Sequence, residues 1–359
     1  MTRRDDPPGA LPAHRGAAHH QAHRDDPVGE DPGSEAGRIA GPDLPRQAMA
    51  DLVAAATMAP SMHNTQPWRF RFQPASQTIG LYADPARMLR FGDPDGRALH
   101  IACGAALFNL RLAATVAGRQ PVFRLLPDPG QPLLLATVRL AGRCRPQPVE
   151  LELHAAIPAR RTNRSPLSSQ PVPPGVLAEL AGAARIEGAI LHFPDHQEAI
   201  RLLGLARDAE RALLSDPAYR SELARWAGGA RDREGIPDEV VAPHDPRGTA
   251  PVRDFTPAGP ASYAWFEDEP QLAVLSTHFA GRPAWLRAGQ ALERVWLTAT
   301  VRGLEVSPLT HPLETADAWL VRDPRSGVEY PQMILRFGYA LPVPRTPRRP
   351  VPDVVDGPM

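Results

Sequence analysis

Apolar positions along the chain follow two periods, one typical of helices and one typical of strands. An apolar residue at every third or fourth position predicts helices at 49–57, 104–118, 178–184 and 289–303. Short apolar runs predict strands at 69–72, 133–140, 189–193, 271–276 and 332–337. Long helices that alternate with such strands predict an α+β architecture with helices around mixed sheets.

Two of the predicted helices share their sequence with two others. Residues 104–118 align without gaps on 289–303, and eight of these fifteen positions are identical. Residues 50–56 match 178–184 in the same way. We predict a duplicated unit, with a first half at 44–150 and a second half at 151–359. The second half holds about 57 additional residues between its matched helices. We place this insertion at about 196–263, where a charged helical pattern and then a Pro/Gly-rich loop indicate a lid-like segment.

The two ends of the chain differ in composition from the rest. Residues 1–43 are rich in Pro, Gly, Asp, Arg and His and contain few large apolar side chains. Such a segment buries too little surface to offset its ordering entropy, so we expect a disordered tail. His19, His20 and His23 lie in this segment and could bind a metal. A solvated tail is the favoured interpretation, so we predict no metal site. From Leu341 onward, proline and arginine predict an extended arm over the surface.

Composition excludes several classes of protein. The formal net charge is zero, so electrostatics favour neither nucleic acid nor an anionic membrane. No apolar run approaches the length of a membrane span, and we expect a cytoplasmic protein. Cys103 and Cys144 are too few for a zinc knuckle or a redox pair. All 40 basic residues are arginine. The absence of lysine excludes Schiff-base enzymes, P-loop nucleotide hydrolases and lysine-dependent kinases.

A polar loop joins the first predicted helix to the first predicted strand. It reads Ala-Pro-Ser-Met-His-Asn-Thr-Gln-Pro-Trp over residues 59–68. Pro60 ends the helix, because proline has no N–H and disfavours helical geometry at the preceding residue. The polar side chains that follow are suited to a polar ligand. They are equally suited to bonding their own backbone in a simple connector.

The loop resembles the Ala-Pro-Ser-x-x-Asn-x-Gln-Pro-Trp signature of the nitroreductase superfamily. Members of that superfamily are dimeric enzymes that bind flavin mononucleotide (FMN) between subunits. The variant with His-Asn-Thr-Gln-Pro-Trp-Arg-Phe resembles the actinobacterial Acg family. The resemblance implies a nitroreductase-like fold that is duplicated within one chain. The monomer would then act as a pseudo-dimer, and further association to a homodimer stays open.

The same resemblance implies one complete FMN site. Residues 158–166, Pro-Ala-Arg-Arg-Thr-Asn-Arg-Ser-Pro, resemble the basic run that grips FMN, and 303–310 resemble the loop beside the flavin ring. The first half lacks the basic run and the second half lacks the Pro-Ser loop, so a single FMN per chain is expected. The implied cofactor-binding residues are Pro60, Ser61, Met62, Asn64, Gln66, Arg160, Arg161, Thr162, Asn163, Arg164, Ser307, Pro308, Leu309, Thr310, Arg345, Arg348 and Arg349.

These features imply an FMN-dependent oxidoreductase that passes electrons from NAD(P)H to a nitroaromatic, a quinone or a similar small acceptor. His63 and His311 are candidate proton donors, although His63 would serve equally well to cap its loop. There is no Gly-x-Gly-x-x-Gly motif, so no separate dinucleotide-binding domain is expected. One alternative is an FMN-sequestering protein with little turnover, because an ordered lid would exclude nicotinamide. A weaker alternative is a structural protein that binds no flavin.

Overall fold

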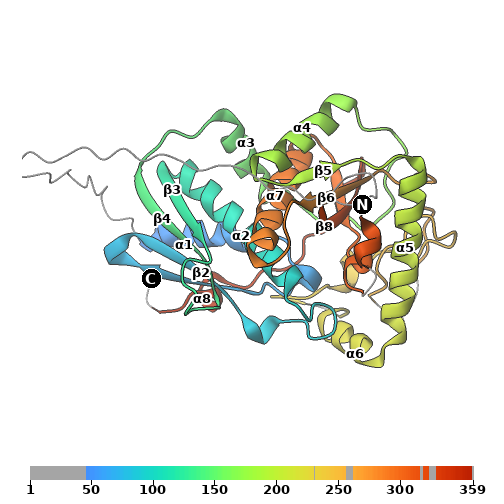
Figure 1. Cartoon of the computed structure of the whole chain (residues 1–359), viewed down its shortest axis with the longest axis horizontal. Coiled ribbons are helices and arrows are strands. Elements are labelled where there is room, and N and C mark those ends of the chain that lie inside the picture. Colours follow the sequence, from blue (N-terminus) through green and yellow to red (C-terminus); the bar gives the residue numbers. More distant parts are fainter. Residues whose placement is uncertain (1–45, 230, 256–261, 316–317, 323–328, 358–359) are drawn as a thin grey trace, which may run out of the picture. The chain divides into compact units, whose positions relative to one another are not determined.

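The computed structural model describes residues 46–229, 231–255, 262–315, 318–322 and 329–357 (Figure 1). The predicted disordered tail, residues 1–43, lies outside these residues. All described residues belong to one unit that spans residues 40–359. The predicted boundary between the halves at residue 150 lies within this unit.

The described strands form two four-stranded sheets with the same order. The first is β1-β2-β4-β3, built from β1 (Trp68–Gln73), β2 (Thr78–Ala83), β3 (Arg119–Leu125) and β4 (Leu134–Arg143). The second is β5-β6-β8-β7, built from β5 (Ile190–His192), β6 (Leu272–Thr277), β7 (Glu305–Pro308) and β8 (Tyr330–Gly338). In each sheet the last strand in sequence returns between the second and the third.

The prediction of mixed sheets is wrong for the named strands. Every ladder between them is antiparallel. Parallel pairing among the described residues is confined to isolated bridges, such as Phe70 with Val355 and Thr162 with Val306. The physical reason is that one helix connects β2 to β3 and another connects β6 to β7, and the final strands β4 and β8 then return between these strands, antiparallel to both neighbours. The sequence pattern carries no information on strand direction.

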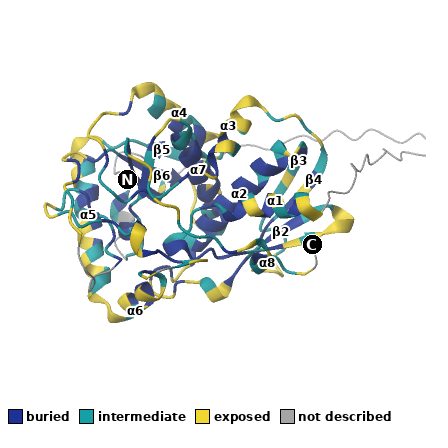
Figure 2. Ribbon diagram, turned by 180° about the vertical axis from the view of Figure 1, so that it is seen from behind, coloured by how far each residue is buried: buried dark blue, intermediate teal, exposed yellow. Residues whose placement is uncertain are grey.

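Helices separate and cover the sheets. Those of the first half are α1 (Arg46–Thr57) and α2 (Arg97–Val116), followed by α3 (Pro148–Ala156). Those of the second half are α4 (Pro174–Ile186), α5 (His196–Ser215), α6 (Pro217–Trp226), α7 (Arg282–Val301) and the short α8 (Val351–Val354). Figures 1 and 2 show α2 and α7 side by side between the sheets, and most of their side chains are buried.

Two glycines allow α2 and α7 to approach closely. A Cβ atom on Gly104 would collide with the carbonyl oxygen of Leu286 and lie 3.0 Å from the Cα of Gly289. A Cβ atom on Gly289 would collide with the carbonyl oxygen of Ile101 and lie 2.8 Å from the Cα of Gly104. Gly104 and Gly289 occupy the same position in the sequence repeat, so each half makes the same close contact with the other.

By length and composition, helix α2 is long and apolar enough to cross a membrane, which differs from the expectation that no apolar run approaches that length. It has 20 residues and a mean hydropathy of 1.4 in its most apolar window, and 89% of that window is buried inside the fold. Burial of this extent is typical of a core helix.

Two segments connect the halves beyond this helical contact. The chain between β5 and β6 contains α5 and α6 and then a long irregular stretch. The C-terminal segment leaves β8 and crosses to the first half, where Val354 is fully buried in that half's apolar core. Asp356 accepts a hydrogen bond from Nε of Arg69 on β1 at 2.7 Å.

Candidate functional site

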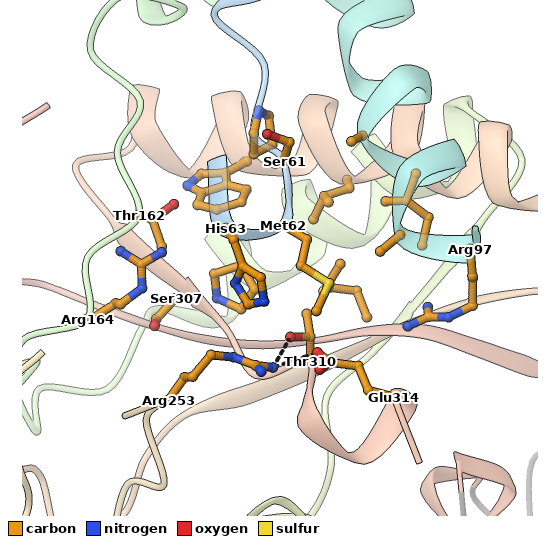
Figure 3. Close-up of a pocket in the computed structure, with 18 of the residues that line it drawn as sticks. Ser61, Met62, His63, Arg97, Thr162, Arg164, Arg253, Ser307, Thr310 and Glu314 are labelled. Carbon is orange, nitrogen blue, oxygen red and sulfur yellow. Dashed lines mark hydrogen bonds and ion pairs between the residues drawn. The ribbon is translucent and has the colours of Figure 1, made fainter. Parts of the chain in front are cut away.

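A cavity lies between the two halves, with a volume of about 840 Å³ including the open space at its mouth. The first half contributes the 60–63 loop and the first turns of α2. The second half contributes the 162–164 segment, α7, β7, and part of the chain between β5 and β6 (Figure 3). Its wall contains Pro60, Ser61, Met62, His63, Arg97, Ala98, Ile101, Ala102, Thr162, Arg164, Val252, Arg253, Phe255, Leu292, Trp296, Ser307, Pro308, Thr310, Glu314 and Met333.

The 60–66 loop divides its side chains between the cavity and the surrounding chain. Ser61, Met62 and His63 line the cavity. Asn64 instead donates to the carbonyl oxygens of Gly235 and Pro347, each at 3.0 Å. Gln66 donates to the carbonyl oxygen of Arg233 at 2.7 Å. The structure thus places Asn64 and Gln66 away from the cavity wall, as anchors of the loop.

These anchors hold an unusual backbone. His63, Asn64 and Gln66 have φ angles of 50°, 55° and 52°, which side-chain-bearing residues adopt at an energetic cost. The hydroxyl of Ser61 accepts from the Gln66 N–H at 2.9 Å and closes the loop. Both sequence interpretations therefore describe part of the loop, because it bonds its own chain and also presents side chains to a cavity.

His63 is held as a neutral imidazole. It is 5% exposed and lies edge-on to Phe255, with 5.7 Å between ring centroids. Burial lowers its pKa well below the usual value, and the charges of Arg253 and Arg164 lower the pKa further. At neutral pH the ring carries one N–H and no net charge, so any proton that it supplies comes from that neutral N–H.

His311 lies behind the cavity wall. Its side chain is 1% exposed, and its Nε2 is 3.1 Å from Oε2 of Glu210 on α5. Burial again is the largest cause that lowers its pKa, followed by the charge of Arg253. The sequence predicts His311 beside the flavin loop, and the structure places it in a short 3-10 helix, His311–Leu313, that packs against α5 and β8.

The cavity wall is electrostatically positive. Three arginines reach it from separate elements: Arg97 from α2, Arg164 from the segment before α4, and Arg253 from the chain between β5 and β6. Arg253 forms an ion pair with Glu314 at 2.6 Å and donates to the Thr310 hydroxyl at 3.0 Å (Figure 3). The guanidinium of Arg164 stacks on Phe255 at 4.9 Å, and burial lowers its pKa to about 10.

A second arginine cluster lies directly behind this wall. Arg160 stacks on the ring of cavity residue Trp296 at 4.7 Å, and it donates to the Met58 carbonyl oxygen at 3.1 Å. Arg348 donates to the same carbonyl at 3.2 Å. Burial lowers the pKa of Arg348 to about 9, and the charges of Arg160 and Arg345 lower it further. The cluster also includes Arg161, whose pKa is lowered by burial and then by Arg345.

This cluster is incompletely neutralised by the described residues. Glu293, which is fully buried on α7, lies 3.6 Å from Nε of Arg160 and accepts from Asn109 at 2.9 Å. Nε and Nη1 of Arg160 and Nε of Arg348 are buried without a hydrogen-bond partner in this part of the chain. Mutually repelling guanidinium groups with unused donors are suited to a phosphate.

The remaining predicted residues fall into two groups. Thr162, Ser307, Pro308 and Thr310 line the cavity. Asn163, Leu309 and Arg349 do not: Asn163 donates to the Leu341 carbonyl oxygen at 3.0 Å, and the Arg349 N–H donates to Gln66 at 2.8 Å.

The predicted flavin loop at 303–310 contains strand β7, which is a correction to the sequence interpretation. The Leu309 N–H donates to the Ile334 carbonyl oxygen of β8 at 2.9 Å. Sheet pairing therefore uses this donor, and it does not point to a ligand. Ser307 and Pro308 still present atoms to the cavity from the edge of the sheet.

Several cavity residues were not found from the sequence. Arg97 follows a left-handed Gly96 at the start of α2, but no motif surrounds it. Arg253 and Phe255 belong to the Pro/Gly/Asp-rich stretch. It has no helical or strand periodicity from which the inward-pointing side chains could be predicted. Leu292 and Trp296 lie in the helix that the sequence predicts at 289–303, and helical periodicity does not show that they line a cavity.

The chain is similar over most of its length to proteins of Mycobacterium tuberculosis. It is 38% identical over 318 residues to "Putative NAD(P)H nitroreductase Rv3131", which covers 86% of this chain and 90% of that protein. It is 32% identical over 315 residues to "Putative NAD(P)H nitroreductase acg", with 84% of this chain and 93% of that protein covered.

A crystal structure described as a putative nitroreductase from Anabaena variabilis aligns with a TM-score of 0.45 and 12% identity, over 82% of this chain and 88% of that chain. No protein-family model matches the chain. The identities to the mycobacterial proteins span both halves, and they confirm the resemblance that the 59–68 loop first indicated. The chain therefore belongs to the Acg family of NAD(P)H nitroreductases.

Proposed function

We propose that this protein is an FMN-dependent oxidoreductase that passes electrons from NAD(P)H to a nitroaromatic, a quinone or a similar small acceptor. A single FMN would bind between the two halves. The names of the mycobacterial relatives support the nicotinamide-dependent reductase class. The arrangement of arginines around the cavity is the observation that supports the flavin.

The residues present are suited to FMN. In the cluster of Arg160, Arg161, Arg345 and Arg348, Arg160 and Arg348 have buried donors without partners among the described residues, and Arg160 stacks on the cavity residue Trp296. We infer that this cluster would hold the phosphate. The cavity between the 60–63 loop and β7 would then hold the ring, with the chain between Arg161 and Arg164 connecting the two.

We further propose that the chain arose by duplication of one nitroreductase-like unit. The identical strand order of the two sheets supports this, as does the reciprocal contact of Gly104 with Gly289. Each half keeps a different part of the site. The first supplies the Pro-Ser loop and the second supplies the basic run, which is consistent with one complete site.

FMN, when bound, supplies the two-electron chemistry, so the protein need not provide a nucleophile. Arg164 would stabilise negative charge near the ring, because its guanidinium faces the cavity without a carboxylate within ion-pair distance among the described residues. The neutral His63 and the hydroxyl of Ser61 provide hydrogen-bond donors at the opposite wall. Phe255 and Met62 also line the cavity, where their apolar side chains would restrict the access of water.

An FMN-sequestering protein is the second candidate function. It is favoured by the position of Val252, Arg253 and Phe255, which belong to the chain between β5 and β6 and form part of the cavity wall. Arg253 fastens this segment to Glu314 and Thr310 in the second half. A wall closed in this way would protect bound flavin from nicotinamide.

An anaerobic absorbance spectrum distinguishes these functions. The purified protein is expected to show a flavin band at about 450 nm, which bleaches when NADH or NADPH is added. A band that persists until dithionite is added would identify the sequestering protein. No band after incubation with excess FMN and desalting would contradict the cofactor assignment itself.

Variants of the arginine cluster test the location of the phosphate. Arg161→Ala and Arg345→Ala should each weaken FMN binding by about 1.5–3 kcal/mol, because a charged hydrogen bond is lost. Both side chains are accessible enough for the fold to tolerate their removal. Arg185→Ala, at an exposed position on α4, is the matched control and should leave the FMN dissociation constant unchanged. Equal affinity in all three variants, measured by fluorescence titration, would contradict the single-site assignment.

A further inference from the structure

Arg97 is a cavity residue that the proposed flavin site does not use. In Figure 3 it lies on the other side of Met62 and His63 from Arg164. Its Nη1 donates to the carbonyl oxygen of Gln332 at 2.5 Å and its Nη2 to that of Leu313 at 3.4 Å. These carbonyls orient the guanidinium, but they do not neutralise it.

The nearest acids are engaged elsewhere. Asp93 and Glu314 influence Arg97 only through longer-range electrostatics. The carboxylate of Asp93 accepts from the backbone N–H groups of Ala98 and Leu99, each at 2.8 Å. Glu314 is paired with Arg253. Within the described part of the chain, Arg97 therefore has no carboxylate at ion-pair distance.

The charges of the cavity do not cancel. Its described wall contains Arg97, Arg164 and Arg253 against the single carboxylate of Glu314, and His63 is neutral at pH 7. If Arg164 serves the flavin ring and Arg253 pairs with Glu314, one positive charge remains, at Arg97. Ala98, Ile101 and Met333 line the same cavity and provide an apolar surface for a flat ring.

We propose that the electron acceptor of this site is an aromatic or quinonoid molecule with an anionic substituent, a carboxylate or a sulfonate, that binds to Arg97. The inference rests on the proposed function and names the class of its acceptor. A guanidinium binds such a group through two parallel hydrogen bonds, which are stronger in a cavity shielded from water. A phosphate of the nicotinamide dinucleotide is the other source of an anion, and the experiment separates the two.

The test uses two ligands of nearly the same shape, 4-nitrobenzoate and 4-nitrobenzamide, which differ in charge. Calorimetric titration of the FMN-loaded protein should show that 4-nitrobenzoate binds about ten-fold or more tightly than 4-nitrobenzamide. Arg97→Gln should abolish this preference, and Arg97→Lys should keep part of it. Arg185→Gln, on the surface of α4, is the control and should keep all of it.

The outcomes separate this inference from the proposed function. Equal binding of the two ligands to the unmodified protein, or an unchanged preference in Arg97→Gln, would overturn the role of Arg97 whether or not the flavin turns over. A loss of affinity for NADP+ in Arg97→Gln, with the 4-nitrobenzoate preference intact, would assign Arg97 to the dinucleotide and also overturn it. A clear preference in a protein whose flavin NAD(P)H does not bleach would leave the anion site standing and contradict the reductase.

Discussion

At the scale of single residues, the composition of the 59–68 loop indicated a binding loop, but it did not predict which of its side chains point into the cavity. Ser61, Met62 and His63 turn to the cavity, whereas Asn64 and Gln66 turn to backbone groups of residues 233–235 and 347–349. All five are plausible ligands by chemistry. Their different roles depend on partners far away in sequence, which no local pattern contains.

Asp93 gives a pH-dependent prediction at this scale. Burial raises the pKa of Asp93 to about 6, although two backbone N–H groups and Arg97 favour its charged form. The folded protein therefore binds this proton more tightly than the unfolded chain, for which the reference pKa is 3.8. Its contribution to stability is complete below pH 3.8 and is lost as the pH rises through about 6.

Asp93→Asn removes this titration. Between pH 4 and pH 7, the free energy of unfolding of the unmodified protein should fall by up to about 3 kcal/mol relative to Asp93→Asn. Urea denaturation of both proteins at several pH values measures this difference. A difference that is constant over that range would show that Asp93 is not perturbed in this way.

At the scale of elements, periodicity located the long helices and missed short or interrupted strands. α1 and α4 contain their predicted segments, and α2 and α7 contain theirs except for the last two residues, because one face of each helix is buried at helical spacing. β2 contains Gly80 and β3 contains Pro121, and both residues weaken a strand pattern. β7 lies in the segment 303–310, which is interpreted from the sequence as a loop because it resembles the loop beside the flavin ring. Its strand conformation depends on pairing with β8, which the local sequence does not show.

The contact between α2 and α7 gives a prediction for a pair of elements. Gly104→Ala and Gly289→Ala should each destabilise the protein by about 1–3 kcal/mol or more, because backbone atoms occupy the space of the new methyl group. Gly182→Ala, within α4, meets no atom within 4 Å and should stabilise by about 0.4–1 kcal/mol. Thermal unfolding compares the three. Similar effects at all three positions would contradict the close helix crossing.

At the scale of the whole molecule, the C-terminal segment completes the first half. It carries Arg345 and Arg348 to the end of α1, and it then places Val354 in the first apolar core. The sequence predicted an arm over the surface. The structure shows that the end of this arm is buried, in contact with a half that begins about 300 residues earlier.

Val354→Ala tests this connection between the halves. It should lower the free energy of unfolding by about 1.5–3 kcal/mol, because a fully buried side chain loses two methyl groups. Val149→Ala, at a valine that is 51% exposed on α3, should change the stability by less than about 0.5 kcal/mol. Urea midpoints provide the comparison. Equal midpoints would show that the arm does not stabilise the first half.

The sequence by itself determined the architecture class, the long helices, the internal repeat and the family, because periodicity and a ten-residue motif are local properties of the chain. It also identified the two arginine-rich segments, at 160–164 and 345–349. Only the tertiary structure decided the direction of the strands and the close contact of α2 with α7 at Gly104 and Gly289. It also decided which of those arginines line the cavity and which belong to the cluster behind its wall. It also decided that Arg97 and Arg253 reach the cavity. Burial, pairing and charge balance depend on which distant segments meet, and that information exists only in the folded molecule.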